Sequence, residues 1–384
     1  MKNNKLHKIA IIGGGPAGCF CAYNLQKHFD VTIFEQNKPL FTLLPTGGGR
    51  CNLAHNEFDI NNLAHNYPRG EKFLYSIFSR FATKETLNFF HKIGIQTYTQ
   101  NDNRIFPKSN NSQDVREKIL TSLNFTKFKN ETVIDIKTQP LTVVTDKNFY
   151  TFDDIVIAIG GHSKYSILNA LGHNIISPKP ALTALKTREN FSLLKGISLQ
   201  NVRYKKLIGD ILFTHNGISG PLIYKISSIK ARDVFPYEIS LDLIENINLQ
   251  EKFEENPHKT IKNILSDFLP KTFAEFVLDL CNIDAQLKAY TINKKIRNNI
   301  LEKLHNFKIN ITAPTKGNEV VTCGGVDLKE INSKTLESKL IPSIYFCGEV
   351  MDIDGFCGGF NLQNCWSTAY CVAESIIEKY KQSL

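Results

Sequence analysis

The chain has 384 residues, of which 42% are hydrophobic and 22% charged, and this ordinary composition excludes a disordered or fibrous protein. At about 150 residues per domain, the length suggests two or three domains. The apolar runs are too short to span a membrane, and the basic N-terminus lacks a signal-peptide cleavage pattern. We therefore expect a cytoplasmic protein without membrane contact.

The first informative motif joins two predicted strands and a helix. An apolar run at residues 9–12 ends in the glycine-rich segment 13–18, a helical pattern follows from about residue 17 to 28, and a second apolar run at 31–34 ends in Glu35. A strand, a G-x-G-x-x-G pattern, a helix and an acidic residue about 20 positions on form the context of a dinucleotide site. The alternative is a buried strand and helix joined by glycines, without a ligand.

Each residue type in this motif has a physical role. Gly13 turns the chain, Gly15 lets a pyrophosphate approach the backbone N–H groups, and Gly18 lets helix and sheet pack closely. The helix N-terminus offers unpaired N–H donors and the positive end of a dipole to the phosphates. Glu35 can accept both ribose hydroxyls of an adenosine and would repel the extra phosphate of NADP.

The segment 46–52 reads Thr-Gly-Gly-Gly-Arg-Cys-Asn and is the best candidate to touch a flavin, because three glycines admit a large planar ring. Arg50 supplies a fixed positive charge for a pyrophosphate or a substrate carboxylate, and a surface ion pair is its alternative role. Cys51 is a weak catalytic candidate or a small packing residue. A redox dithiol would need a partner cysteine at position 56, which is Asn56.

Two further strand-like runs also end in glycines. Residues 154–159 lead into Gly160 and Gly161, and residues 344–347 lead into Gly348 and Glu349. Small residues at these places allow a cofactor to lie against the backbone. NAD domains are usually contiguous, so a second nucleotide-contacting turn far along the chain favours FAD.

The last helix is predicted to begin near Asn361 and to bury one apolar face. That face consists of Leu362, Cys365, Trp366, Ala369, Val372, Ala373 and Ile376. Just before it, Gly358, Gly359 and Phe360 are expected to leave N–H groups free for the N1–C2=O edge of a flavin. Negative charge accumulates on that edge on reduction, where a helix N-terminus stabilises it.

Several polar residues are weaker candidates. His162 and His215 lie in glycine-containing turns and can exchange protons near neutral pH, with His215 the favoured catalytic candidate. Asp352 and Asp354 follow Glu349 and would bind ribityl hydroxyls or brace their loop. Structural roles remain the alternative for all four.

Cysteines and charge bear on partners. The nine cysteines contain no C-x-x-C pair, so we expect free thiols in a reducing compartment and no metal site. The net charge is +9, and residues 179–206 are especially basic. Such a face attracts nucleic acid or an anionic substrate, but no recognised binding motif accompanies it, so nucleic acid is the less favoured partner.

Four segments together resemble one family, the bacterial BaiN/YhiN-like NAD(P)/FAD-dependent oxidoreductases. They are residues 13–18, 46–52 and 213–221 and the turn at Gly348 and Glu349. The similarity extends through residues 321–326 and 345–363 and covers nearly the whole chain. One departure is Ile159, where related flavoproteins commonly have Thr, so a hydroxyl contact to the cofactor is expected to be missing.

The resemblance implies an α/β fold: a two-dinucleotide-binding, Rossmann-like FAD domain with an inserted β-barrel domain and a small helical subdomain. We place the FAD domain at residues 1–181 and 322–384, the barrel at 182–245 and 308–321, and the helical subdomain at 246–307. Motif and resemblance together predict FAD contacts from Gly13, Gly15, Pro16, Ala17, Gly18, Glu35, Gly48, Gly49, Arg50, Cys51, Asn52, Gly160, Gly161, Gly348, Glu349, Gly359, Phe360, Asn361 and Leu362.

The expected function is an FAD-dependent oxidoreductase that reduces an unsaturated or carbonyl-conjugated small molecule. NAD(P)H is its expected electron donor, which the resemblance alone implies. Three alternatives stay open: an FAD oxidase that uses oxygen, an RNA-binding or RNA-modifying flavoprotein that docks through the basic segment, and a plain NAD dehydrogenase. Neither the substrate nor the oligomeric state can be read from the sequence.

Overall fold

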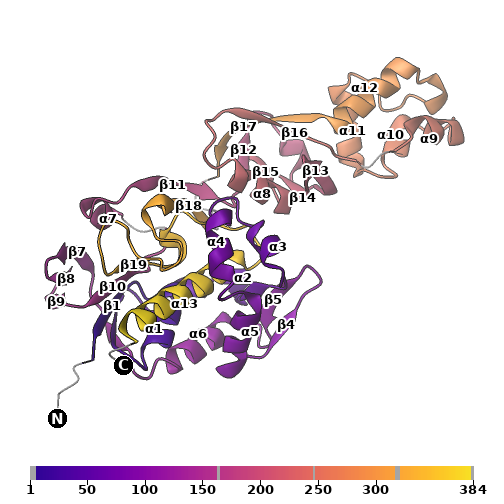
Figure 1. The fold of residues 1–384 in the computed structure, drawn as a ribbon. Helices are drawn as coiled ribbons and strands as arrows, with labels where there is room; N and C mark the ends of the chain where they lie inside the picture. The colour runs from indigo at the N-terminus through magenta and orange to yellow at the C-terminus, as the bar shows by residue number, and fades with distance from the viewer. Residues whose placement is uncertain (1–5, 162–164, 245–246, 316–320, 382–384) are drawn as a thin grey trace, which may run out of the picture. The chain divides into compact units, whose positions relative to one another are not determined.

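The computed structural model describes residues 6–161, 165–244, 247–315 and 321–381 (Figure 1). The chain divides into two compact units. Unit 1 comprises Met1–Lys179 and Val321–Leu384, and unit 2 is Pro180–Val320. The finer division of unit 2 into a barrel and a helical subdomain stays a prediction.

Unit 1 is built on a five-stranded parallel sheet in the order β19-β10-β1-β2-β6. The four apolar runs identified in the sequence all form neighbouring strands of this sheet, and their near-continuous burial is typical of a parallel sheet covered on both faces. The strands are β1 (Lys8–Ile12), β2 (Asp30–Phe34), β6 (Lys127–Lys129), β10 (Asp154–Ile157) and β19 (Ile344–Phe346). The predicted Rossmann-like fold class is confirmed.

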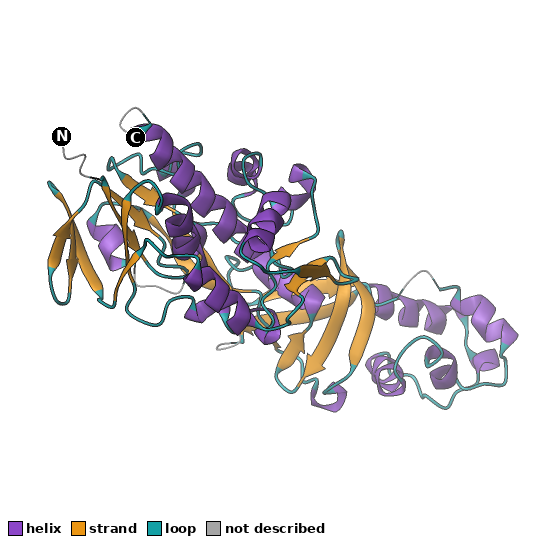
Figure 2. Cartoon of the chain, turned by 90° about the horizontal axis from the view of Figure 1, so that it is seen from below, coloured by secondary structure: helices purple, strands orange, loops and turns teal. Residues whose placement is uncertain are grey.

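Two helices pack side by side on this sheet, α1 (Pro16–Leu25) and α13 (Phe360–Tyr380), as Figures 1 and 2 show. The predicted apolar face of α13 is buried except at the half-buried Leu362, and polar residues on the other sides of the helix are buried as well. Gln363, for example, donates to Thr86 Oγ1 and Ser367 Oγ, each at 2.9 Å. The helix is therefore enclosed on several sides and is a central element of unit 1.

Smaller elements surround this core. A three-stranded sheet in the order β3-β5-β4 and another in the order β7-β8-β9 are antiparallel, and β11 pairs with β18. The strands are β3 (Ala54–His55), β4 (Thr97–Thr99), β5 (Arg104–Pro107), β7 (Val133–Thr138), β8 (Leu141–Thr145), β9 (Phe149–Thr151), β11 (Ile175–Ala181) and β18 (Val321–Val326). The helices are α2 (Thr46–Gly49), α3 (Ile60–Ala64), α4 (Glu71–Phe78), α5 (Thr83–Lys92), α6 (Ser112–Thr121) and α7 (Ser166–Ala170), with short 3-10 turns η1 (Phe41–Leu43), η4 (Leu328–Glu330) and η5 (Gly348–Val350).

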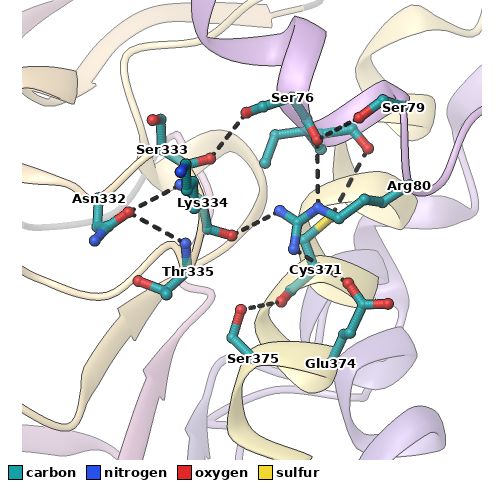
Figure 3. A network of polar contacts seen from close by, with 11 residues as sticks. Ser76, Ser79, Arg80, Asn332, Ser333, Lys334, Thr335, Cys371, Glu374 and Ser375 are labelled. Carbon is teal, nitrogen blue, oxygen red and sulfur yellow. Dashed lines mark hydrogen bonds and ion pairs between the residues drawn. The ribbon is translucent and has the colours of Figure 1, made fainter. Parts of the chain in front are cut away.

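A polar clamp around Arg80 joins three segments of unit 1 (Figure 3). Its guanidinium donates to the carbonyl oxygen of Ser76 in α4, to that of Lys334, and to Glu374 Oε2 on α13, at 3.3, 2.7 and 3.1 Å. Ser76 Oγ also donates to the carbonyl oxygen of Ser333 at 3.0 Å. The clamp therefore ties α13 at Glu374 to α4 and to the segment around Lys334.

Unit 2 contains an antiparallel sheet in the order β13-β14-β15-β12-β17-β16. Arg203 on one edge strand exchanges two backbone hydrogen bonds, at 2.8 and 2.9 Å, with Asp242 just after the other edge strand, so the sheet closes on itself as a barrel. The strands are β12 (Leu185–Thr187), β13 (Ser198–Tyr204), β14 (Leu207–Thr214), β15 (Gly217–Ser219), β16 (Tyr237–Leu241) and β17 (Phe307–Pro314).

Helices complete unit 2, and Figure 1 shows α9 to α12 grouped beyond one end of its sheet. One hydrophobic core runs through both parts, because the ring of Phe213 on β14 packs 5.4 Å from that of Phe273 on α11. The elements are α8 (Pro221–Ile229), α9 (Leu249–Glu255), α10 (Ile261–Leu265), α11 (Lys271–Leu280) and α12 (Lys294–His305), with 3-10 turns η2 (Ser192–Leu194) and η3 (Ala289–Thr291). Within the described parts of the chain, no helix combines the length and apolar character needed to cross a membrane.

Candidate cofactor site

The first glycine turn connects β1 to α1 and has no room for side chains at two of its positions. A Cβ at Gly13 would lie 2.3 Å from the carbonyl oxygen of Ala158, and φ there is +106°. A Cβ at Gly18 would lie 2.0 Å from the carbonyl oxygen of Gly13. Gly13 therefore turns the chain against β10, and Gly18 brings α1 onto the turn, as the sequence motif requires.

Gly15 differs from these two glycines because it faces open space. A Cβ at this position would meet only Thr42 Oγ1, at 3.8 Å. Gly15 is the N-cap of α1 and Pro16 occupies the first turn, so the N-terminus of the helix points at this space without a capping side chain. A helix N-terminus beside open space is suited to a phosphate.

Glu35 lies beside the same turn at the carboxyl end of β2. Its Oε2 accepts a hydrogen bond from the N–H of Gly14 at 2.8 Å, and its Oε1 accepts one from the N–H of Asn37 at 2.8 Å. These bonds fix the carboxylate next to the glycine turn, where the adenosine ribose is expected in a dinucleotide site.

The second nucleotide turn meets the first one directly. A Cβ at Gly348 in η5 would lie 2.8 Å from Ala17 Cβ and 3.5 Å from Cys365 Sγ on α13. The N–H of Gly348 donates to Thr368 Oγ1 at 2.9 Å. The fold thus brings together the start of α1, η5 and α13, although the chain separates them widely.

The turn after β10 lies against η5 as well. A Cβ at Gly161 would come 3.5 Å from the carbonyl oxygen of Glu349, whereas Gly160 faces open space at φ +77°. The Tyr165 hydroxyl donates to the carbonyl oxygen of Gly161 at 3.3 Å and covers this turn from one side. The predicted cofactor positions in these two turns are therefore neighbours.

Glu349 itself is partly exposed, yet protein atoms surround its carboxyl group. Burial and, as a smaller cause, the nearby charge of Asp354 together raise the pKa of Glu349 to about 7. A carboxyl group with this pKa donates a hydrogen bond when protonated and accepts one when ionised, which suits contact with ribityl hydroxyls or phosphate oxygens.

The triple-glycine segment forms the short α2 turn, in which Gly47, Gly48 and Gly49 all have positive φ. A Cβ at Gly47 would collide with the backbone N of Asn52 and with Phe106, at 2.8 Å each. Gly48 and Gly49 have nothing within 4 Å of that position. Two of the three glycines therefore present bare backbone to open space, as contact with a planar ring requires.

Arg50 is held in place by its stem and leaves its terminal nitrogens available. Its Nε donates to the carbonyl oxygen of Gly47 at 3.2 Å, and its guanidinium carbon lies 4.1 Å from the centre of the Phe106 ring. No ion pair of Arg50 occurs among the residues that the structure describes. Arg104, 5.7 Å from the same ring, is instead neutralised by Asp102.

The segment after Arg50 is tied to the N-terminus of α13. With its amide oriented to satisfy both ends, Asn52 accepts from the N–H of Gly359 at 2.9 Å and donates to the carbonyl oxygen of Ala54. The expectation that the N–H of Gly359 is free is therefore wrong. The side chain of Asn361 is also engaged, because it both accepts from and donates to the backbone of Gly355 at 2.8 and 2.9 Å.

The remaining sequence candidates differ in their surroundings. Cys51 is completely buried and burial raises the pKa of its thiol to about 12, which suits a packing residue and not a thiolate nucleophile. His215 lies in unit 2, in the exposed turn between β14 and β15, and His162 lies outside the described residues. Asp354 is fully buried and forms a two-pronged ion pair with Arg69, so its side chain braces the loop after η5.

His55 was missed by the sequence reasoning. It is the last residue of β3, lies half-buried, and its Nδ1 is 3.0 Å from the carbonyl oxygen of Gly358. Its ring stacks on Phe360 at 4.5 Å between centroids. The one signal in the sequence was that His55 follows the segment 46–52 by three residues. Its partners in the structure, Gly358 and Phe360, lie far away in the sequence.

FAD fits these residues. Gly15, Gly48, Gly49 and Gly160 leave open space where a Cβ would stand, the N-terminus of α1 begins beside Gly15, and Arg50 has no ion-pair partner among the described residues. The parallel sheet, the two nucleotide turns and the inserted sheet-rich unit define the class of the protein as an FAD-dependent oxidoreductase.

The chain belongs to the HI0933-like protein Rossmann domain family, which matches residues 7–375. It is similar to the Ribosomal RNA dihydrouridine synthase of Escherichia coli, with 28% identity over 96% of this chain and 97% of that protein. It is also similar to the 3-dehydro-bile acid delta(4,6)-reductase of Clostridium scindens, with 25% identity over 97% of this chain and 100% of that protein. The predicted BaiN/YhiN-like family is confirmed.

A solved structure shows the same fold. The 3-ketosteroid delta1-dehydrogenase from Sterolibacterium denitrificans aligns with a TM-score of 0.51 and 11% sequence identity, over 97% of this chain and 99% of that chain. At this identity the similarity bears on the fold alone.

Proposed function

We propose that the protein reduces a carbon–carbon double bond conjugated to a carbonyl group, with FAD as the resident cofactor and NAD(P)H as the electron donor. The observation that carries the proposal is that relatives aligned over nearly their whole length are named for related chemistry. A dihydrouridine synthase saturates a double bond of uracil, and the bile-acid enzyme saturates double bonds conjugated to a 3-oxo group. Both are reductions of a conjugated carbonyl compound.

The residues of unit 1 support binding and charge stabilisation in this reaction. The open glycines and the start of α1 would hold the diphosphate, Glu35 the adenosine ribose, and Glu349 the ribityl chain. When bound, FAD supplies hydride transfer at N5. The Arg50 guanidinium, which has no ion-pair partner among the described residues, would stabilise negative charge that develops on the cofactor or on the substrate carbonyl.

The electron donor is tested by mixing the FAD-loaded protein with NADH or with NADPH in the absence of oxygen. Loss of the oxidised flavin absorbance with either nucleotide is the expected result. If the flavin stays oxidised with both, but is reduced by a substrate and reoxidised by oxygen, the protein is an oxidase and the proposal is wrong.

Ribosomal RNA is a specific second candidate for the substrate, in place of a small molecule. Two relatives bear the rRNA name, at 28% and 29% identity. Unit 2 also presents exposed cations that form no ion pair with other described residues: Lys186, Arg188, Lys195, Lys205 and Lys206. Neutralisation of phosphates by such residues releases counterions, so RNA affinity must fall as salt rises.

The two substrate classes are separated by one pair of assays. The reduced protein is incubated with rRNA prepared from cells that lack this gene, and with a bile acid carrying a 4-en-3-one. Dihydrouridine detected by mass spectrometry, with salt-sensitive RNA binding, identifies the RNA substrate. Saturation of the steroid alone identifies the small-molecule substrate.

A further inference from the structure

His55 is anchored in a way that defines which of its nitrogens carries a proton. Its Nδ1 lies 3.0 Å from the carbonyl oxygen of Gly358, which can only accept, so Nδ1 must be the donor. The stacked ring of Phe360 fixes the plane of the imidazole. Nε2 has no hydrogen-bond partner within the described parts of the chain.

This anchoring does not depend on the protonation state of the ring. Nδ1–H donates to Gly358 both in the neutral imidazole and in the imidazolium, so Nε2 can gain or lose a proton while the ring stays in place. A group that transfers protons in catalysis needs this property, because its position has to be kept through the catalytic cycle.

The charged groups around His55 come from three segments. Burial lowers the pKa of His55, while the Gly358 carbonyl, Glu57 and Asp102 act in the opposite direction and Arg104 again lowers it. Asp102 and Arg104 are paired with each other, so their effects on the imidazole largely cancel. The ring is therefore held mainly neutral at pH 7, with a protonated form accessible below it.

His55 also shares a surface with the cofactor segment. It lies opposite Arg104 in the β3–β5 register, and Phe106 is two residues further along β5, so the three side chains are on one face of this small sheet. Arg50 stacks on Phe106 on that face. Unit 1 thus places the titratable Nε2 of His55 and the guanidinium of Arg50 on the same face, next to the triple-glycine turn.

We infer that His55 is a catalytic residue that, as the imidazolium, gives the proton on Nε2 to the substrate and returns to the Nδ1–H imidazole, an inference that rests on the proposed function. The double bond breaks as its carbon remote from the carbonyl gains a hydride and its carbon next to the carbonyl gains the proton. The two electrons come with the hydride and originate in the nicotinamide donor. His55 then recovers a proton from solvent.

The first test needs no substrate. In FAD-loaded protein with 15N-labelled histidine, NMR at neutral pH should show His55 as the Nδ1–H tautomer, with its signals assigned by their loss in His55→Asn. Reducing the flavin with dithionite adds negative charge and should raise the pKa of His55, whereas the ring signals of His91, bonded to Thr97 in the same unit, should not move. An Nε2–H tautomer, or the same His55 pKa in both redox states, overturns the inference.

The second test measures the two half-reactions separately. His55→Asn keeps a donor near the position of Nδ1 but has no titratable nitrogen, so the FAD content and the rate of flavin reduction by NAD(P)H should match the wild type. Reoxidation of the reduced flavin by 2-cyclohexen-1-one should slow by about 100-fold or more. His91→Gln should change neither step.

The outcomes distinguish the two proposals. If the enone, the steroid and rRNA all fail to reoxidise the reduced flavin of the wild type, the proposed function is wrong. The NMR measurement still shows in that case whether His55 lies close enough to the flavin to sense its charge. If the wild type reacts and His55→Asn reacts equally fast, or if both half-reactions slow together, His55 is not the proton donor.

Discussion

The sharpest prediction concerns Gly15 and Gly18, two glycines of the same motif with different surroundings: Gly15 faces open space, and Gly18 is packed against protein atoms. Gly15→Ala adds a methyl group that meets no protein atom closer than 3.8 Å, on a backbone with φ of −77° that any residue adopts. Loss of a glycine N-cap costs at most about 1 kcal/mol, and the reduced freedom of the unfolded chain offsets about 0.4–1 kcal/mol. The FAD-free fold should therefore be as stable as the wild type.

The same methyl group would occupy the approach of the diphosphate to α1. We expect the Kd for FAD to rise at least tenfold, which corresponds to about 1.4 kcal/mol. At an FAD concentration about 100 times the wild-type Kd, ligand stabilisation would fall from about 2.7 to about 1.4 kcal/mol. For a unit of this size, that lowers the FAD-induced rise in Tm by roughly 3–5 °C.

Gly18→Ala is the matched variant, and we expect it to lower the stability of the FAD-free protein. Its methyl group would lie 2.0 Å from the carbonyl oxygen of Gly13 and 3.3 Å from Ile11 Cγ2, both in the packed interior. The FAD-free protein should lose about 1–3 kcal/mol or more of stability. Thermal melts with and without FAD, together with the flavin content of purified protein, separate the two effects. A Gly15→Ala variant that binds FAD as tightly as the wild type refutes the assignment of the cradle.

Three further predictions follow from charged groups. Arg50→Gln should lower the flavin content or slow flavin reduction, whereas Arg104→Gln, whose cation is already paired, should not; equal effects would contradict the role given to Arg50. The pKa of Glu349 in the folded protein is raised from 4.5 to about 7, so its contribution to stability is fully present below pH 4.5 and is lost as the pH rises through 7. Between pH 5 and 8, the Tm of FAD-free Glu349→Gln should therefore fall less than the Tm of the FAD-free wild type. Asp354→Asn breaks a buried ion pair and should lower the free energy of unfolding, measured in urea, by about 3–5 kcal/mol. Replacing Arg69 by Met in the same protein should recover part of this stability. If the losses from the two single substitutions simply add in the double variant, the pairing is contradicted.

The sheet of unit 1 could be predicted because its strands are buried on both faces and therefore appear as continuous apolar runs. The run at residues 344–347 was recognised in the same way as the run at 9–12, although the two strands are far apart in the chain and only β10 lies between them in the sheet. The environment of α13 was predicted less well. A helix enclosed on all sides can bury polar residues such as Gln363 when they bond to one another, and periodicity identifies only its apolar positions.

The site could be predicted where a residue type is required by the backbone itself, as at Gly13, and not where a side chain acquires its role from a distant partner. His55 and Gly358 are 303 positions apart, and Arg69 and Asp354 are 285 apart. Their pairing arises because the segment after the triple-glycine turn folds onto the N-terminus of α13, and the motif pattern contains no sign of that contact. Glycine spacing therefore locates the cofactor, whereas the residue that moves the proton emerges only once the two ends of unit 1 are brought together.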